Sequence, residues 1–212
     1  MHSLNGLRQQ FQYTFNESHK RARIVIGLGT CGIAAGAEKV WTAVSNYIET
    51  QGLEIAMMAT GCVGMCYAEP LMEVHLPGEP RFIYGNLKPE NAVAILKRHL
   101  QEGSPSPEYI VAQDPRGYEA AANIVKLGDT PFYKEQVKNV LGRCGLIDPD
   151  QISHYIACHG YEALEKVLDE MSPIKVIREI SNSGLRGRGG GGFPTGRKWE
   201  AAYNSPGSKK YV

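Results

Sequence analysis

Residues 23–32 are RIVIGLGTCG, a short β-branched run that ends in a glycine-rich turn. Apolar residues then recur at intervals of three or four from Val40 to Ile48, which predicts a helix over residues 34–50. A second apolar run at residues 53–58 predicts another strand. The crossover between the two runs favours a parallel pair of strands, as in α/β folds.

The next segment predicts a hairpin and a helix. Residues 71–76 alternate between apolar and polar side chains, residues 77–80 supply a turn, and residues 81–84 form the return strand. Pro89 then opens a helix that carries an apolar stripe as far as Leu100. The fold class expected here is α/β, with one parallel pair and an antiparallel hairpin at the edge.

The second half of the chain has a different composition. A polar, proline-bearing stretch at residues 102–108 marks the change, and no apolar periodicity returns until Tyr133. Helices are expected over residues 135–141, 150–157, 160–171 and 173–180. This half is too small to bury a large core by itself, so we expect it to pack against something else. The expected organisation has four parts: a helical extension at 1–20, an α/β domain at 21–105 that stays monomeric alone, a linker at 106–131, and a mainly helical part at 132–212.

The composition is that of an ordinary globular protein. The 212 residues contain 23 Lys and Arg against 22 Asp and Glu, and 42% are apolar. A near-zero net charge argues against a nucleic-acid binder that depends on phosphate contacts. The apolar runs are too short to span a bilayer, and no secretory signal is recognisable, so we expect a cytoplasmic protein without a membrane span. Five cysteines then favour metal or redox chemistry over a disulfide framework.

Residues 27–32 satisfy the G-x-G-x-x-G fingerprint of dinucleotide-binding folds. That motif also requires an acidic residue at the end of the second strand, where it binds the ribose. Glu54 lies at the beginning of that strand instead, and the strand ends in Ala59-Thr60. The sequence therefore disfavours a dinucleotide site at this turn.

Three cysteines follow the two predicted parallel strands. Cys31 lies after the first strand, and Cys62 and Cys66 lie after the second. Because the carboxyl ends of parallel strands meet at one edge of a sheet, we expect these thiols to converge. Thiolates are the ligands of iron–sulfur clusters. The alternative is that all three are ordinary small buried residues.

A glycine-rich stretch lies near the end of the chain. Seven glycines fall within residues 184–196, interrupted by Arg186 and Arg188 and followed by Arg197-Lys198. Consecutive glycines let a backbone approach a planar ring or a pyrophosphate closely, and their N–H groups bind anions. A flexible linker seldom carries Phe193, Pro194 and Trp199 at its end. The stretch therefore predicts a cofactor-binding loop.

Both halves resemble known electron-transfer proteins. Residues 60–71 resemble the second half of the cluster site of a thioredoxin-like [2Fe-2S] ferredoxin, in which one cysteine pair is separated by four residues and the other by three. The glycine loop, together with residues 132–137, 144–149 and 160–164, resembles the FMN- and NADH-binding flavoprotein of respiratory NADH dehydrogenase and of soluble multimeric hydrogenases. Only the N-terminal portion of that flavoprotein family is matched.

The resemblance implies a fold, cofactors and site residues. The fold is a thioredoxin-like ferredoxin domain followed by the mainly helical start of a flavoprotein domain. A [2Fe-2S] cluster would be bound by Cys31, Cys62 and Cys66. The fourth cysteine is expected at Ile26 if Cys31 is the second of its pair, which we prefer, or at Gly36 if Cys31 is the first. The flavin and nucleotide loop would comprise Gly184, Leu185, Arg186, Gly187, Arg188, Gly189, Gly190, Gly191, Gly192 and Phe193, with Lys198 near FMN.

The implied function is electron transfer from NAD(P)H through FMN and iron–sulfur clusters to a partner oxidoreductase. The implied partners are a small ferredoxin-like subunit and a hydrogenase or formate dehydrogenase catalytic subunit. Because the family continues past the glycine loop, we expect this chain alone to be inactive. One alternative is an assembly or electron-relay module with at most one cluster. Another is a thiol–disulfide protein, which the lack of a C-x-x-C motif disfavours.

Overall fold

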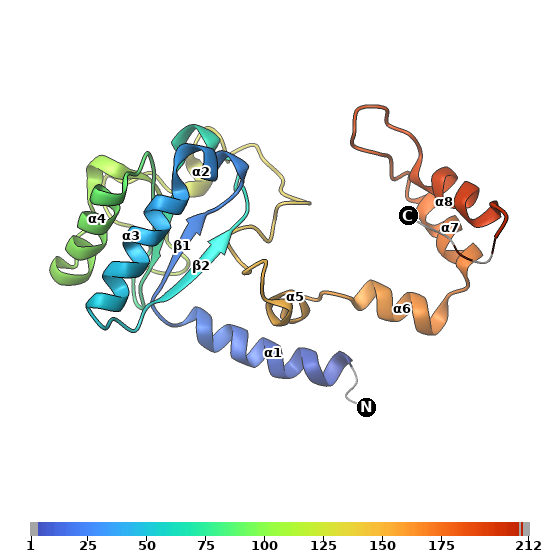
Figure 1. The fold of residues 1–212 in the computed structure, drawn as a ribbon, viewed down its shortest axis with the longest axis horizontal. Helices are drawn as coiled ribbons and strands as arrows, with labels where there is room; N and C mark the ends of the chain where they lie inside the picture. Colours follow the sequence, from blue (N-terminus) through green and yellow to red (C-terminus); the bar gives the residue numbers. More distant parts are fainter. Residues whose placement is uncertain (1–3, 208, 210–212) are drawn as a thin grey trace. The chain divides into compact units, whose positions relative to one another are not determined.

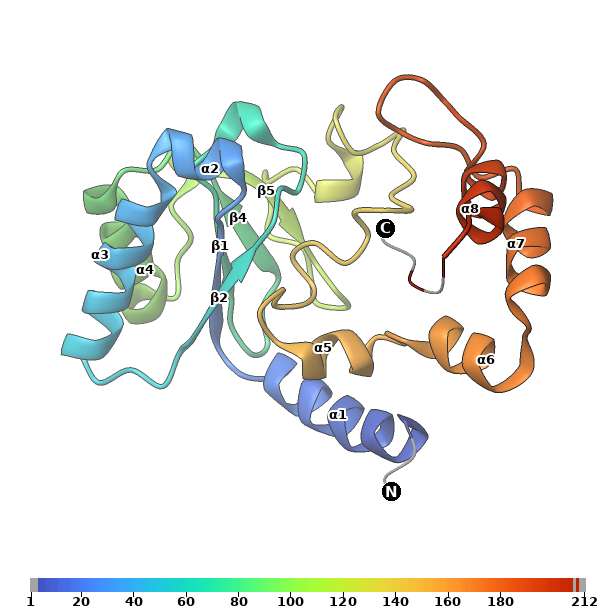
Figure 2. The same cartoon turned by 45° about the vertical axis from the view of Figure 1, so that its right-hand side comes forward.

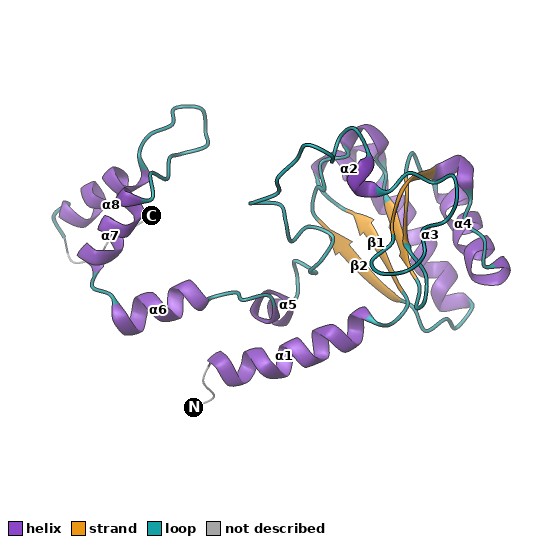
Figure 3. Cartoon of the chain, turned by 180° about the vertical axis from the view of Figure 1, so that it is seen from behind, coloured by secondary structure: helices purple, strands orange, loops and turns teal. Residues whose placement is uncertain are grey.

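The computed structural model describes residues 4–207 and 209, which form two compact units that divide between Cys158 and His159. The first unit contains a five-stranded mixed sheet in the order β2-β1-β3-β4-β5. Its strands are β1 (Arg23–Gly27), β2 (Ala56–Thr60), β3 (Met72–His75), β4 (Arg81–Tyr84) and β5 (Ile110–Asp114). Figures 1 and 3 show the neighbouring strands β1 and β2 of this sheet. Strands β1 and β2 are parallel, and the other neighbours are antiparallel. The parallel pair and the hairpin confirm the α/β class predicted for this part.

One face of the sheet carries the apolar core. Helices α3 (Ala37–Thr50) and α4 (Pro89–Glu102) cover this face, and the short helix α2 (Thr30–Ala35) precedes α3 (Figure 1). Every second strand residue, such as Ile24 and Val74, packs against the apolar stripes of these helices. The helical spacing predicted from Val40 to Ile48 is confirmed, because Val40, Val44 and Ile48 are all buried. The loops that carry Cys31, Cys62 and Cys66 follow β1 and β2 and therefore lie at one end of this sheet.

The opposite face of the sheet carries both polar and apolar side chains, and it is also buried. Glu73, His75 and Arg81 point to this face, and each is less than a tenth exposed. Residues 127–146 cover it: Leu127, Phe132 and Tyr133 pack near Ile83, and further along the segment Gly145 approaches Glu73. Helix α1 (Leu4–His19) packs against α5 (Ile152–Ala157) beside this segment, where the views in Figures 1 and 2 agree. The first unit therefore needs the chain as far as Cys158.

The expected linker at residues 106–131 contains structure. It holds the 3-10 turns η2 (Pro107–Tyr109) and η3 (Leu127–Asp129), and between them β5 pairs with β4. The Gln113 side chain is fully buried and donates to the carbonyls of Ala121 and Ile124. The polar, proline-bearing composition favours a linker, but hydrogen bonds to the edge of β4 stabilise residues 110–114 as a strand. Residues 21–105, the predicted α/β domain, consequently lack the fifth strand of the sheet.

Three other elements differ from expectation. Strand β2 lies at Ala56–Thr60 and not at 53–58. Residues 135–141 form irregular backbone with bends and not a helix, because Val137 and Val140 face solvent at 85% and 92% exposure and supply no packing. Helix α8 (Thr195–Asn204) follows the glycine loop and was not among the predicted helices.

The second unit consists of α6 (Glu162–Glu170), α7 (Pro173–Asn182), the glycine loop and α8. Helices α7 and α8 pack together, with Gly196 buried against Ser181. No residue of α6 or α7 is buried, and Leu164 and Leu168 are 49% and 75% exposed. Within the described residues, no helix is long and apolar enough to cross a membrane.

Candidate functional site

Two of the three predicted cluster cysteines lie together in the loop after β2. The Cys62 and Cys66 sulfur atoms are 3.6 Å apart, and the Gly64 N–H donates to the Cys62 sulfur at 3.3 Å. Gly64 has φ +93°, the left-handed conformation that lets the chain turn between the two thiols. Both thiols are free, with Cys66 exposed and Cys62 half-buried. The loop therefore presents a paired thiol site.

The loop after β1 reaches the same site. A Cβ on Gly29 would lie 2.9 Å from the Cys62 backbone nitrogen, so the two loops touch where the sequence predicted convergence. Cys31 follows in the first turn of α2 and is exposed. Within residues 4–207 and 209, however, no three metal-ligating side chains are close enough to hold an ion. The structure thus gathers Cys62 and Cys66, and the assignment of Cys31 stays a prediction.

The geometry of the pair fits two ligands of a single iron. A tetrahedral thiolate site with metal–sulfur bonds of about 2.3 Å separates its sulfur atoms by about 3.8 Å. The observed 3.6 Å is close to this value, whereas a disulfide needs about 2.05 Å. The pair therefore suits one half of a [2Fe-2S] cluster, and the other half requires thiols beyond these two.

A distant segment covers the cysteine loop. The Tyr133 hydroxyl donates to the Val63 carbonyl at 2.6 Å, and the Lys138 ammonium contacts the same oxygen at 3.5 Å. Lys138 also lies 3.6 Å above the centre of the Tyr133 ring. Phe132 fills the space beside Gly64, where a Cβ would approach its ring to 3.0 Å. We call residues 132–145 the covering segment.

The covering segment brings a further thiol to the site. The Cys144 sulfur lies 3.9 Å from the position that a Cβ on Gly61 would take, next to Cys62 in sequence. The adjacent Gly145 N–H donates to Thr60 Oγ1 at 2.7 Å and fixes this approach. No role for Cys144 could be predicted, because nothing in the sequence indicates that residues so far from the loop fold onto it.

Burial shifts the pKa values of two groups at this site toward their neutral forms. The Gly64 N–H lowers the pKa of Cys62, but burial and the neighbouring Cys66 and Glu69 outweigh it and leave the pKa above its usual value. Burial lowers the pKa of Lys138, and Arg81 adds to this effect. A bound cation would reverse the preference of Cys62, because metals stabilise thiolates.

The glycine loop connects α7 to α8 in the second unit, and hydrogen bonds join its two ends. The Gly187 N–H donates to the Phe193 carbonyl at 2.9 Å, and the Thr195 N–H donates to the Leu185 carbonyl at 2.9 Å. The Arg186 side chain closes the turn by donating to the Gly192 carbonyl at 3.1 Å. The loop is therefore ordered at its base.

The tip of the loop has an open backbone. Gly184, Gly190 and Gly192 have positive φ angles of 70°, 101° and 57°. No heavy atom lies within 4 Å of the Cβ positions of these three or of Gly189 and Gly191. Consecutive exposed amides of this kind can approach an anion or a planar ring.

Two side chains predicted at the cofactor are exposed beside the loop. Phe193 is 55% exposed, with the Arg197 guanidinium 5.8 Å from its ring centre. Lys198 lies in the first turn of α8 and is also exposed. The residues of the loop are thus accessible, and their role in binding stays a prediction.

No family model matches the chain. It is 49% identical over 83 residues to the HndC protein of the NADP-reducing hydrogenase of Solidesulfovibrio fructosivorans, covering 39% of this chain and 17% of that protein. It is 49% identical over 61 residues to an NADH-quinone oxidoreductase subunit of Aquifex aeolicus, covering 29% and 14%. It is also 31% identical over 83 residues to HndB, another subunit of the S. fructosivorans hydrogenase, covering 39% of this chain and 66% of HndB.

Among solved structures, a thioredoxin-like [2Fe-2S] ferredoxin from Aquifex aeolicus matches 47% of this chain and 99% of its own. That match has 21% identity and a TM-score of 0.40. The chain spans less than a fifth of the length of HndC and of the A. aeolicus oxidoreductase protein. The sequence matches show that the chain is homologous to subunits of NADH-quinone oxidoreductase and of NADP-reducing hydrogenase.

Proposed function

We propose that the chain is an electron-transfer part of an NAD(P)H-dependent oxidoreductase, the N-terminal part of its diaphorase subunit. The observation that carries the proposal is the 3.6 Å pair of Cys62 and Cys66, set against Gly29 of the neighbouring loop. The relatives named NADP-reducing hydrogenase and NADH-quinone oxidoreductase support it. A [2Fe-2S] cluster would supply one-electron chemistry, and FMN would exchange a hydride with NAD(P)H.

The chain's own residues have distinct roles in this proposal. Cys62 and Cys66 hold one side of the cluster, and the Gly64 N–H stabilises negative charge on sulfur. Cys31 and Cys144 are the thiols available for the other side. Residues 132–212 provide the start of the FMN- and NAD(P)H-binding part, with the glycine loop as one wall of that site.

Iron analysis tests the cluster proposal directly. The full chain, purified and reconstituted without oxygen, is expected to hold about two irons and two labile sulfides. Cys62→Ser and Cys66→Ser are expected to lose most of this iron. Cys158→Ser is the matched control, because Cys158 is half-buried in the same unit and outside the loop. Equal iron content in all four proteins would disprove the proposal.

The flavin has a separate test. Because the loop offers a single open wall, the 212-residue chain is expected to retain little FMN and to show no NADH oxidation. A full-length relative is expected to bind FMN, and Gly190→Val in it should abolish binding, since φ +101° is strained for a branched residue. Stoichiometric FMN in the 212-residue chain would contradict this expectation.

A relay module that carries a cluster but no flavin is the second candidate. The open space around the glycine loop favours it, because nothing in the described residues of the second unit encloses a ring there. FMN titration of a full-length relative separates the two candidates. Binding favours the diaphorase role, and iron without flavin favours the relay.

The partners follow from the same proposal. Electrons would pass to a small ferredoxin-like subunit and to a hydrogenase or formate dehydrogenase catalytic subunit, in the cytoplasm. The relatives are named as subunits, and this supports an assembly. Affinity purification of the tagged protein from its native cells, followed by mass spectrometry of the soluble fraction, tests both points. Recovery without any oxidoreductase subunit would contradict them.

A further inference from the structure

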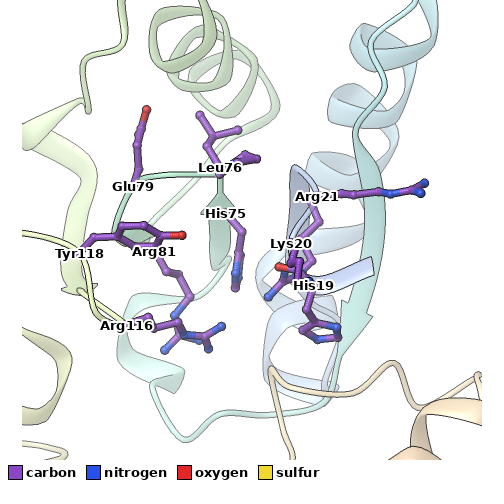
Figure 4. Close-up of a pocket in the computed structure, with 11 residues that line it drawn as sticks. His19, Lys20, Arg21, His75, Leu76, Glu79, Arg81, Arg116 and Tyr118 are labelled. Atoms are coloured by element: carbon purple, nitrogen blue, oxygen red, sulfur yellow. The ribbon is translucent and has the colours of Figure 1, made fainter. Parts of the chain in front are cut away.

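A cavity of about 80 Å³ lies at the end of the sheet opposite the cysteine loops (Figure 4). Arg23 at the start of β1, His75 at the end of β3 and Arg81 at the start of β4 meet there. Arg116 and Tyr118, which follow β5, also line it. The cavity therefore lies within the first unit and has no residue in common with the cysteine site.

Arg23 is the least compensated cation of this cavity. It is only 5% exposed, and its Nη1 donates to the His19 carbonyl at 2.7 Å. Its Nε has no hydrogen-bond partner among the described residues. A buried guanidinium with an unpaired N–H carries a large desolvation cost, which an anion would offset.

Two further guanidinium groups share the available carboxylates. Arg81 donates to Glu73 at 3.0 Å and to Asp114 at 2.9 Å, while its Nε also lacks a partner within the described part of the chain. Arg116 donates to the same Asp114 carboxylate at 2.9 Å. Three guanidinium groups thus face two carboxylates, which leaves one positive charge uncompensated.

The remaining charged residues do not balance this excess. Glu79 lines the cavity, but its carboxylate binds His99 at 3.1 Å and points away from Arg116 in Figure 4. Arg21 also points away from the cavity in that view. Lys20 is paired with Glu17 at 2.6 Å.

Burial, with a smaller contribution from neighbouring guanidinium groups, shifts the pKa values of two lining residues. Burial lowers the pKa of Arg23 to about 10, and repulsion from Arg116 and Arg81 adds to the effect against the attraction of Glu73. Burial lowers the pKa of His75 to about 4, where Glu73 opposes the change and Arg23 and Arg81 reinforce it.

We propose that this cavity is a binding site for one small oxyanion of the phosphate class. Guanidinium N–H groups match the oxygens of such an anion in geometry and charge. The volume is several times the roughly 10–15 Å³ that one water needs, which admits a single oxyanion and excludes a nucleotide. The bound anion contacts the segment between α1 and β1, the β3–β4 hairpin and the residues that follow β5, and so connects all three.

Calorimetric titration of the full chain with inorganic phosphate at constant ionic strength tests the site. One phosphate is expected to bind per chain, and chloride at equal ionic strength is expected not to compete. Arg116→Gln should weaken binding at least about tenfold, because a charge-assisted hydrogen bond is lost. Arg116 is part-exposed, so this variant keeps the fold. Arg178→Gln, an exposed arginine in the second unit, is the matched control and should bind normally.

A second titration with glycerol 3-phosphate distinguishes a free ion from the phosphate of a larger molecule. Tighter binding of the monoester identifies the latter, and binding of inorganic phosphate alone identifies the former. Amide chemical shifts of Arg23, His75 and Arg116 should move on binding, and that of Cys62 should not. No binding by the wild-type chain, or equal binding by Arg116→Gln, would overturn the proposal. Because the cavity and the cysteine loop are separate, iron content is unaffected by either result.

Discussion

Gly29 has no room for a side chain, since a Cβ there would meet backbone atoms of Cys62. Gly29→Ala is therefore expected to destabilise the first unit by about 1–3 kcal/mol and to lower its iron content. Urea denaturation and iron analysis measure the two effects. Gly128→Ala is the control, because its Cβ meets nothing within 4 Å and it should change stability by less than about 0.5 kcal/mol. Equal behaviour of the two variants would contradict the close approach of the loops.

Cys144 gives a second prediction at this scale. If its thiol serves the cluster, Cys144→Ser should accelerate bleaching of the visible spectrum in air relative to wild type. Cys158→Ser should bleach at the wild-type rate. Should both variants bleach alike, Cys144 is a packing residue beside Gly61 and the cluster relies on other ligands.

His75 predicts a dependence of stability on pH. Its pKa falls to about 4 on burial, against about 6.5 in the unfolded chain. The unfolded state therefore binds more protons between these values, and the free energy of unfolding should decrease as pH falls from about 6.5 to 4, by up to about 3 kcal/mol. Below pH 4 the contribution of His75 to the free energy of unfolding stays lower by the same amount.

Glu73 extends the decrease to lower pH. Its burial alone would raise its pKa, but Arg81 and His75 outweigh burial and hold it at about 2. Its contribution is complete above its unfolded value and is lost as pH falls through about 2. His75→Gln should make the decrease between pH 6.5 and 4 smaller, with a remainder from His19, His99 and His154, whose pKa values burial also lowers, and it should retain the decrease at lower pH. Chemical denaturation at several pH values measures both, and an unchanged profile in the variant would exclude His75 as its source.

At the scale of elements, the covering segment holds the cysteine loop through few contacts. Tyr133→Phe removes the hydrogen bond to the Val63 carbonyl and should cost about 0.5–1.5 kcal/mol. It should also speed hydrogen exchange of the Gly145 amide, which is bound to Thr60. Tyr13→Phe, at a site 71% exposed, serves as the control and should change neither quantity. Unchanged exchange in Tyr133→Phe would show that the segment is held by its other contacts.

The elements with strong periodicity could be predicted, and those that depend on a distant partner could not. Alternation identified the β3–β4 hairpin, and helical spacing identified α3 and α4. Strand β5 was missed because five residues beside a proline carry no period, and its hydrogen bonds to β4 decide its structure. The helix predicted over residues 135–141 was wrong for the opposite reason. The segment has apolar residues, but they pack against no other part of the described chain.

In the candidate site, too, the features set by local patterns could be predicted, and those that depend on a distant segment could not. The convergence of two loops could be predicted from parallel strands, because their carboxyl ends meet at one edge. The approach of Cys144 could not, because it depends on the chain returning over the second face of the sheet. The 3.6 Å pairing of Cys62 and Cys66 likewise reflects the turn at Gly64, whose conformation the spacing alone does not specify.

At the scale of the whole molecule, the first unit needs residues 106–158. A fragment of residues 1–158 should be monomeric, and residues 1–105 should aggregate, because β4 would then be an open edge and the second face of the sheet would be uncovered. The full chain should self-associate more than residues 1–158, through the exposed apolar residues of α6 and α7. Size-exclusion chromatography with light scattering compares the three. A monomeric, soluble 1–105 fragment would contradict the role of β5.

The return of the chain over its own sheet also determines where chimeras can be joined. A hybrid spliced at the proline-bearing stretch near residue 105 would graft a foreign strand and a foreign cover onto a sheet shaped for β5 and the covering segment. A splice after Cys158 would carry the sheet, its edge strand and its cover together. The transplantable piece of this protein is therefore longer than its ferredoxin-like sequence, and it includes residues that resemble the flavoprotein half.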